Sequence, residues 1–177
     1  MLAHISFPFV ITILIGVILF FLTRYNINWM PFYILGHELT HAFFVLLFSG
    51  EVFKIMVKKD YGYTKTDKNN IIIRLGPYFL PLWIIFILII FYIIKIFIIS
   101  REGIVVIYFN YAFYIVYSLL YAIFIYYNLY LLKRNPQDLR ESGVFLSVTF
   151  TINLFILFMN LSLYLFLQSD RIINSFL

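Results

Sequence analysis

Long apolar runs alternate with short polar segments along the whole chain, and this pattern predicts membrane-spanning helices. Each run is nearly free of charge and comes close to or exceeds the roughly 20 residues that a helix needs to cross a bilayer. The five runs are Ile5–Thr23, Trp29–Phe48, Ile71–Ile99, Ile104–Leu132 and Val144–Leu167. We therefore expect an all-α polytopic membrane protein with about five transmembrane helices, forming a single membrane domain over residues 1–177.

The polar segment after the second run has the composition of a β-hairpin. Val52, Phe53, Ile55 and Val57 favour strands, and Tyr61–Thr64 holds a turn glycine between two tyrosines. We expect a short hairpin at the membrane surface, with an irregular polar loop as the alternative.

The composition also points to a bilayer as the surrounding solvent. The chain is 64% hydrophobic and 12% charged, with a mean hydropathy of +0.98, whereas soluble domains are about half apolar and about a quarter charged. It contains no cysteine, so a metal would have to be held by histidine and carboxylate. The formal charge of +5 lies mostly in short loops between apolar runs, which indicates membrane orientation and no nucleic-acid partner.

The distribution of lysine and arginine predicts the orientation. With five spans, the N-terminus shares one side with the loops Gly50–Asn70 and Lys133–Gly143, and more basic residues are assigned to that side than to the other. The positive-inside rule then places the N-terminus in the cytoplasm. The richer side carries Lys54, Lys58, Lys59, Lys65, Lys68, Arg74, Lys133, Arg134 and Arg140, and the other side carries Arg24, Lys95, Arg101 and Arg171.

The second run contains an H-E-x-x-H motif, from His37 to His41. On a helix His41 lies about 40° round the axis from His37 and about 6 Å along it, so both imidazoles can reach one metal ion. Glu38 borders the same face, as the base of a zinc hydrolase does when it removes a proton from the attacking water. The alternative is a polar cluster that only joins helices, but a carboxylate in mid-membrane costs about 2.5–3.5 kcal/mol and such residues are usually functional.

A catalytic zinc normally takes three protein ligands, so one more is needed. Asp138 precedes the last run, where it would enter the membrane from the side toward which the second helix runs. We therefore expect Asp138 to be the third ligand, and Glu141 is the second choice. Asp138 could instead cap the helix that follows, which is a common role for aspartate.

Three stretches resemble the core of one family, the site-2-protease-type intramembrane zinc peptidases. They are Gly36–Ala42, Gly50–Ile55 and Tyr61–Thr64, and they are most similar to the small, single-domain bacterial branch. In that family a glycine and a membrane-associated β-hairpin follow the H-E-x-x-H helix. An aspartate on a later helix, often within Asn-Pro-…-Asp-Gly, completes the zinc site. In this chain Leu139 occupies the position of that last glycine.

The resemblance implies an intramembrane zinc metalloprotease of the bacterial plasma membrane. Its substrate would be a membrane protein, cleaved in or next to a transmembrane segment. By resemblance His37, His41 and Asp138 bind Zn²⁺ and Glu38 is the general base. The hairpin would offer an edge strand to a locally unwound substrate.

Two other functions are weighed against this one. A non-catalytic membrane protein, either a degenerate peptidase or a metal-binding partner subunit, would tolerate replacement of Glu38. A prenyl-protein-type membrane zinc protease shares the H-E-x-x-H motif, but neither Glu102 nor Glu141 lies in the sequence context that this second family requires.

Overall fold

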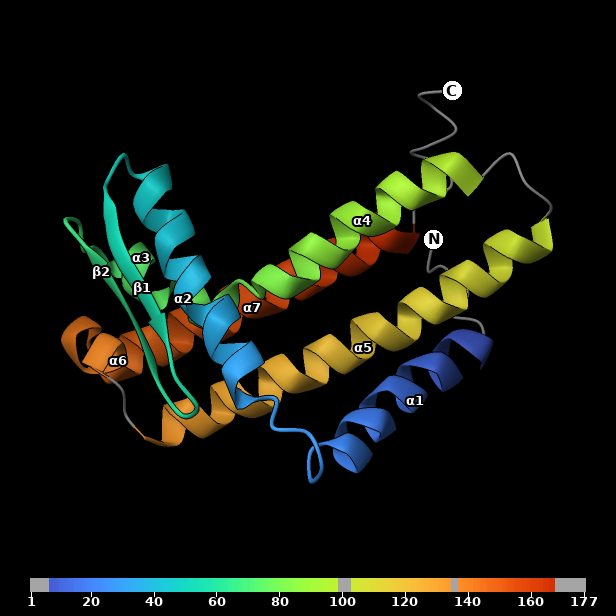
Figure 1. Cartoon of the computed structure of the whole chain (residues 1–177), viewed down its shortest axis with the longest axis horizontal. Helices are drawn as coiled ribbons and strands as arrows, with labels where there is room; N and C mark the ends of the chain where they lie inside the picture. Colours follow the sequence, from blue (N-terminus) through green and yellow to red (C-terminus); the bar gives the residue numbers. More distant parts are fainter. Residues whose placement is uncertain (1–6, 99–102, 135–136, 168–177) are drawn as a thin grey trace. The chain divides into compact units, whose positions relative to one another are not determined.

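The computed structural model is mostly helical and describes residues 7–98, 103–134 and 137–167 (Figure 1). The expected hairpin after the second run is confirmed. In chain order the elements are α1 Phe7–Thr23, α2 Met30–Leu47, β1 Val52–Val57, β2 Gly62–Thr66, α3 Ile71–Phe79, α4 Leu82–Ile98, α5 Gly103–Lys133, α6 Gln137–Ser142 and α7 Val144–Leu167.

Two of the described helices are long and apolar enough to cross a membrane. They are α2, with 18 residues, and the Val105–Lys133 part of α5, with 29 residues. The number rises to three if α3 and α4 are counted together as one interrupted span. These helices are consistent with a membrane protein.

The third apolar run, expected as one span, is divided between α3 and α4. Leu80 has an extended backbone (φ −105°, ψ 99°) and stands directly before Pro81. A proline ring disfavours helical geometry in the residue that precedes it, so the break falls at this point. Pro77 lies inside α3, where it has no N–H to give to the helix.

The contacts of the chain group into two compact units, residues 1–28 with 83–125 and residues 29–82 with 126–177. In the first unit, Phe91 of α4 packs against Phe109 and Phe113 of α5, with ring centroids 5.3 and 4.2 Å apart. Lys95 also lies within α4, is only 1% exposed and places Nζ 5.0 Å from the centre of the Phe91 ring. It was expected among the loop charges that set the orientation, and its burial removes it from them.

The second unit contains the candidate site and has its own core. Helix α3 contacts α2, α6 and α7 there, and α6 also contacts α7. The core joins side chains from α2, α3 and α6. Its buried members are Phe44, Val45, Ile73, Leu75, Tyr78, Phe79 and Leu139. Apolar contacts therefore hold α3 against the helix that carries the H-E-x-x-H motif and join α6 to the same core.

The hairpin runs beside α2, which both of its strands contact (Figure 1). The strands are antiparallel, with Ile55 opposite Thr64 and Val57 opposite Gly62. At the open end, the backbone N–H of Glu51 donates to the Asp67 carboxylate at 2.6 Å. This contact closes the base of the hairpin where the chain leaves α2.

Gly76 allows the close contact between α2 and α3, since a methyl group on its Cα would overlap the Phe44 ring. We predict that Gly76→Ala lowers the free energy of unfolding by about 1–3 kcal/mol, the usual cost of overpacking. Thermal unfolding of the detergent-purified protein would measure the loss. Adding Phe44→Leu to the Gly76→Ala variant should recover part of it. An unchanged melting temperature in the single variant would contradict this packing.

Candidate metal centre

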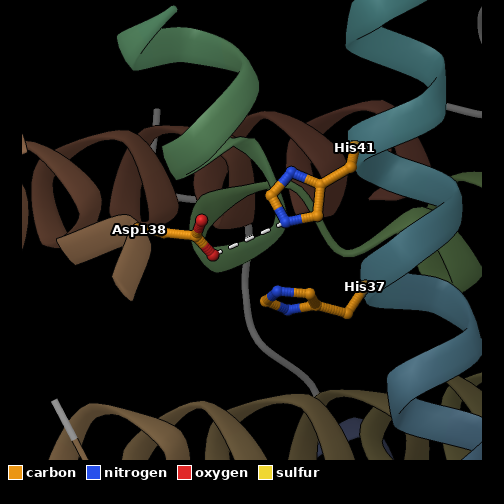
Figure 2. A group of neighbouring side chains, drawn as sticks. All are labelled: His37, His41 and Asp138. Carbon is orange, nitrogen blue, oxygen red and sulfur yellow. Dashed lines mark ion pairs between the residues drawn. The ribbon is translucent and has the colours of Figure 1, made fainter. Parts of the chain in front are cut away.

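His37 and His41 project from α2 toward Asp138 of α6 (Figure 2). Each of the three side chains offers one ligand atom, and these atoms lie within 4.8 Å of one another. The closest approach of the ion pair is 3.6 Å, from Nε2 of His41 to Oδ2 of Asp138. Residues that stand about 100 positions apart in the sequence thus meet at one point, as the motif and the expected third ligand require.

Helix α6 brings Asp138, and not Glu141, to the histidines. Asp138 is the second residue of this helix, so it lies in the first turn and does not act as the N-cap. The next residue, Leu139, is 1% exposed in the apolar core and fixes the helix there. Glu141 instead accepts hydrogen bonds from Arg74 at 3.2 Å and from Gln137 at 2.6 Å. The orientation of α6 about its own axis therefore decides which of the two candidate residues faces the histidines.

The orientation of His41 depends on a backbone carbonyl of α3. Nδ1 of His41 lies 2.7 Å from the Ile73 oxygen, which can only accept a hydrogen bond, so Nδ1 carries the proton. In a regular helix the Ile73 carbonyl would accept from the residue four positions later. That residue is Pro77, which has no N–H, so the carbonyl is available to His41.

The orientation of His37 depends on a chain of buried hydrogen bonds through Asn128 of α5. The side-chain NH₂ of Asn128 donates to the backbone carbonyl of Tyr78 at 3.2 Å. This contact turns the side-chain oxygen of Asn128 toward Tyr33. The Tyr33 hydroxyl donates to that oxygen at 2.7 Å. Nδ1 of His37 lies 3.4 Å from the same hydroxyl. Because the hydroxyl proton is used on Asn128, the Tyr33 oxygen accepts from the Nδ1–H of His37.

The side chain of Glu38 extends from α2 toward strand β2. Its side chain is nearly buried, and the Thr64 hydroxyl contacts its Oε2 at 2.8 Å and its backbone carbonyl at 3.1 Å. Gly62 faces the same carboxylate, and a Cβ there would lie 2.6 Å from Ile34 Cγ2 and 2.8 Å from Glu38 Cγ. Only glycine lets β2 approach α2 this closely, and the approach brings Thr64 to the carboxylate.

A cavity of about 510 Å³ opens beside this group. All five residues of β2 border it, together with Glu38, His41 and Asp138, and Arg74 and Glu141 stand on its wall. Within the described residues the sheet has two strands, so β2 pairs with β1 along one edge only. All five residues of β2 border the cavity, and the edge of β2 that does not pair with β1 can pair with another extended chain.

Charge and hydrogen bonding favour the ionised form of Asp138. Burial works to raise the pKa of this carboxyl, but hydrogen bonding with His41, the charges of His41 and His37, and the Tyr78 hydroxyl together hold the pKa below its ordinary value. The Tyr78 hydroxyl donates to Oδ2 at 3.4 Å. A cation beside this carboxylate, either a proton on the imidazole or a metal ion, is what the arrangement stabilises.

The donor set fits a zinc ion. With Nδ1 protonated on both histidines, each Nε2 carries a lone pair that can bind a metal. Two imidazole nitrogens and one carboxylate oxygen leave a fourth tetrahedral position open, as in catalytic zinc sites. The partners of the two Nδ1 atoms correspond to the hydrogen bonds that metal-ligating histidines usually make.

The sequence predicted the residues that the structure brings together, His37, His41 and Asp138, but missed most of the surrounding polar groups. Tyr33 stands one helical turn before His37, and that spacing could have indicated it. The place of Asn128 within an apolar run indicates an interhelical hydrogen bond but does not identify its partner. Tyr78 gave no signal of its own, and Thr64 appeared only as part of the hairpin, because their contacts join distant parts of the chain. His4, the remaining histidine, lies outside the described residues.

We predict about one zinc ion per chain in the purified wild-type protein. His37→Ala should abolish zinc binding and Asp138→Ala should weaken it, because each removes a ligand. Glu141→Gln is the matched control and should keep its zinc, since Glu141 pairs with Arg74. Metal analysis by mass spectrometry, with chelator competition for affinity, makes the comparison. Full zinc retention in Asp138→Ala would show that the third ligand lies elsewhere.

Comparison with protein-family models, with curated proteins and with solved structures gave no match. The arrangement of His37, His41 and Asp138 therefore has to be interpreted from its own chemistry. That chemistry is a three-ligand group with a buried carboxylate beside it and a cavity in front of it.

Proposed function

We propose that this chain is an intramembrane zinc metalloprotease of the site-2-protease type. In this proposal His37, His41 and Asp138 hold Zn²⁺, and Glu38 is the general base. One observation carries it: Glu38, His41 and Asp138 border the same cavity as β2, a strand that pairs with β1 along one edge only within the described residues. Ligands, base and a backbone able to hold an extended peptide are therefore available in one place.

The chemistry divides between the metal and the protein side chains. Zinc, when bound, lowers the pKa of water to about 7 and polarises a carbonyl group. Glu38 takes a proton from the attacking water and later passes it to the amine that leaves. The Thr64 hydroxyl, 2.8 Å from Glu38 Oε2, holds the carboxylate in place for both transfers. The overall reaction is hydrolysis of one peptide bond.

The position of β2 limits the form of the substrate. A peptide can pair with the free edge of this strand only if its own backbone is extended, because a helix has already used its N–H and C=O groups. A membrane protein whose transmembrane helix is locally unwound meets this condition. The peptide would then pass in front of Glu38, which contacts β2 through Gly62 and Thr64.

Five spans would place the site within the bilayer. They would be α1, α2, the interrupted pair α3 and α4, α5 and α7. The excess of lysine and arginine in the loops after α2 and α5 favours a cytoplasmic N-terminus. Because hydrolysis needs water, the polar cavity beside β2 would serve as the entry, and the resemblance suggests a bacterial plasma membrane.

We predict that Glu38→Gln lowers peptide-bond hydrolysis by about 10²- to 10⁴-fold, the usual contribution of a general base. The variant should keep its zinc, because Glu38 is not among the three ligands. The assay would use proteoliposomes that contain the enzyme and a panel of single-pass membrane proteins with helix-breaking residues. Mass spectrometry would identify the cleaved bonds.

Glu141→Gln is the control for this assay, since it makes the same chemical change on the cavity wall without touching the base. It should cleave at close to the wild-type rate. Equal turnover by wild type and Glu38→Gln would contradict the mechanism. A zinc-loaded wild type that cleaves no member of the panel would favour the non-catalytic alternative, a metal-binding partner subunit.

A further inference from the structure

Both histidines of the motif have an acceptor for Nδ1, and the two acceptors come from different elements. His41 meets the Ile73 carbonyl of α3 at 2.7 Å. His37 meets the Tyr33 hydroxyl of its own helix at 3.4 Å. Neither acceptor would be available in a regular, fully apolar helix pair. Each one exists because a single residue elsewhere makes it available.

Pro77 makes the Ile73 carbonyl available. A residue with an N–H at position 77 would donate to this carbonyl along α3 and compete with His41 for it. The carbonyl is held within the apolar core, where Ile73 is 4% exposed, and an unpaired polar group there is costly. The free carbonyl therefore favours the single ring orientation of His41 that satisfies it.

Asn128 sets the role of the Tyr33 hydroxyl. Asn128 is 7% exposed, and its amide is fixed at both ends, by the Tyr78 carbonyl and by the Tyr33 hydroxyl. Without the side-chain oxygen of Asn128, the hydroxyl proton of Tyr33 would turn toward His37. Nδ1 of His37 would then have to accept that hydrogen bond. That change would move the ring proton to Nε2, the atom that the metal needs.

We infer that Pro77 and Asn128 are positioning residues which prepare the two histidines for the metal before it binds. They act through Ile73 and Tyr33, and each selects the form with the proton on Nδ1 and the lone pair on Nε2. This inference rests on the proposed metal centre, and it adds what makes that centre ready to bind. It does not depend on which substrate is cleaved.

The test uses zinc affinity, measured by chelator competition on the full-length protein in detergent. Asn128→Leu should weaken zinc binding about 10- to 100-fold, the range typical of lost hydrogen bonds to metal-ligating residues. Pro77→Ala should also weaken zinc binding, by an amount near the lower end of this range. The Ile73 carbonyl remains in this variant, but His41 shares it with the N–H of the new alanine. Asn160→Leu and Pro31→Ala are matched controls that should bind like wild type. Asn160 bonds only to the backbone of its own helix in the contacts described here, and Pro31 stands at the start of α2, where no N–H is needed.

Two readouts separate positioning from general damage. The visible absorption of the Co²⁺-loaded protein reports ligand geometry, and it should change in Asn128→Leu and Pro77→Ala but not in the controls. In the zinc-loaded protein labelled with ¹⁵N-histidine, NMR reports which ring nitrogen carries the proton. Wild type should show protonated Nδ1 on both ligands, and the His37 signal should change in Asn128→Leu.

Tyr33→Phe decides the matter if Asn128→Leu fails to fold, since it removes one hydroxyl and nothing else. It should weaken zinc about as much as Asn128→Leu, and combining the two should add little, because both act through one hydrogen bond. Wild-type zinc affinity in Tyr33→Phe and Pro77→Ala would overturn the inference while leaving the metal centre intact. A wild-type protein that binds no zinc would overturn the metal centre itself.

Discussion

The hydrogen bond from His41 to the Ile73 carbonyl is the contact on which the rest of the site depends. A backbone carbonyl without a partner is costly in apolar surroundings, and Pro77 leaves such a carbonyl inside α3. The imidazole of His41 satisfies it at 2.7 Å. The contact therefore fixes the position of α3 against α2 and the direction of the histidine ring together. A hydrogen bond that is missing within α3 thus leaves an acceptor for the His41 side chain of α2.

The remaining parts of the site follow from the placement of α3. Gly76 lets α3 approach the Phe44 ring closely, and Tyr78 of the same helix reaches Asp138 with its hydroxyl and Asn128 with its carbonyl. Leu139 completes the shared apolar core and thereby sets the position of α6. On the opposite side, β2 approaches α2 through Gly62. Packing thus brings His41, the Glu38 and Asp138 carboxylates and strand β2 to one cavity, with His37 grouped beside His41 and Asp138.

The sequence predicted the local features of this protein better than the long-range ones. The H-E-x-x-H motif and the strand propensity of residues 52–57 are local patterns, and the structure contains the helix and the hairpin that they predict. The third run, expected as one span, is interrupted at Leu80, and Pro81 directly after it is the local reason. The burial of Lys95 depends on neighbouring helices, and no pattern in the sequence of α4 predicts it.

The choice of the third ligand also depends on long-range packing, because the two candidate residues lie one helical turn apart. Asp138 and Glu141 are three residues apart and both suited to zinc by chemistry, so the sequence favoured Asp138 but kept Glu141 as the second choice. The choice between them comes from Leu139, whose burial sets the rotation of α6, and from Arg74, which pairs with Glu141. Tyr33 and Asn128 are 95 positions apart, and only the folded chain brings them together.

The central claim is that His37, His41 and Asp138 form one zinc site, and X-ray absorption at the zinc edge tests it most directly. The purified protein should give a first shell of nitrogen and oxygen ligands at about 2.0–2.2 Å. Multiple scattering from two imidazole rings should be present, and sulfur absent, as a chain without cysteine requires. Scattering from both rings would support the site, and no zinc signal should remain in His37→Ala. A spectrum without imidazole scattering, or a protein that takes up no zinc, would contradict the account.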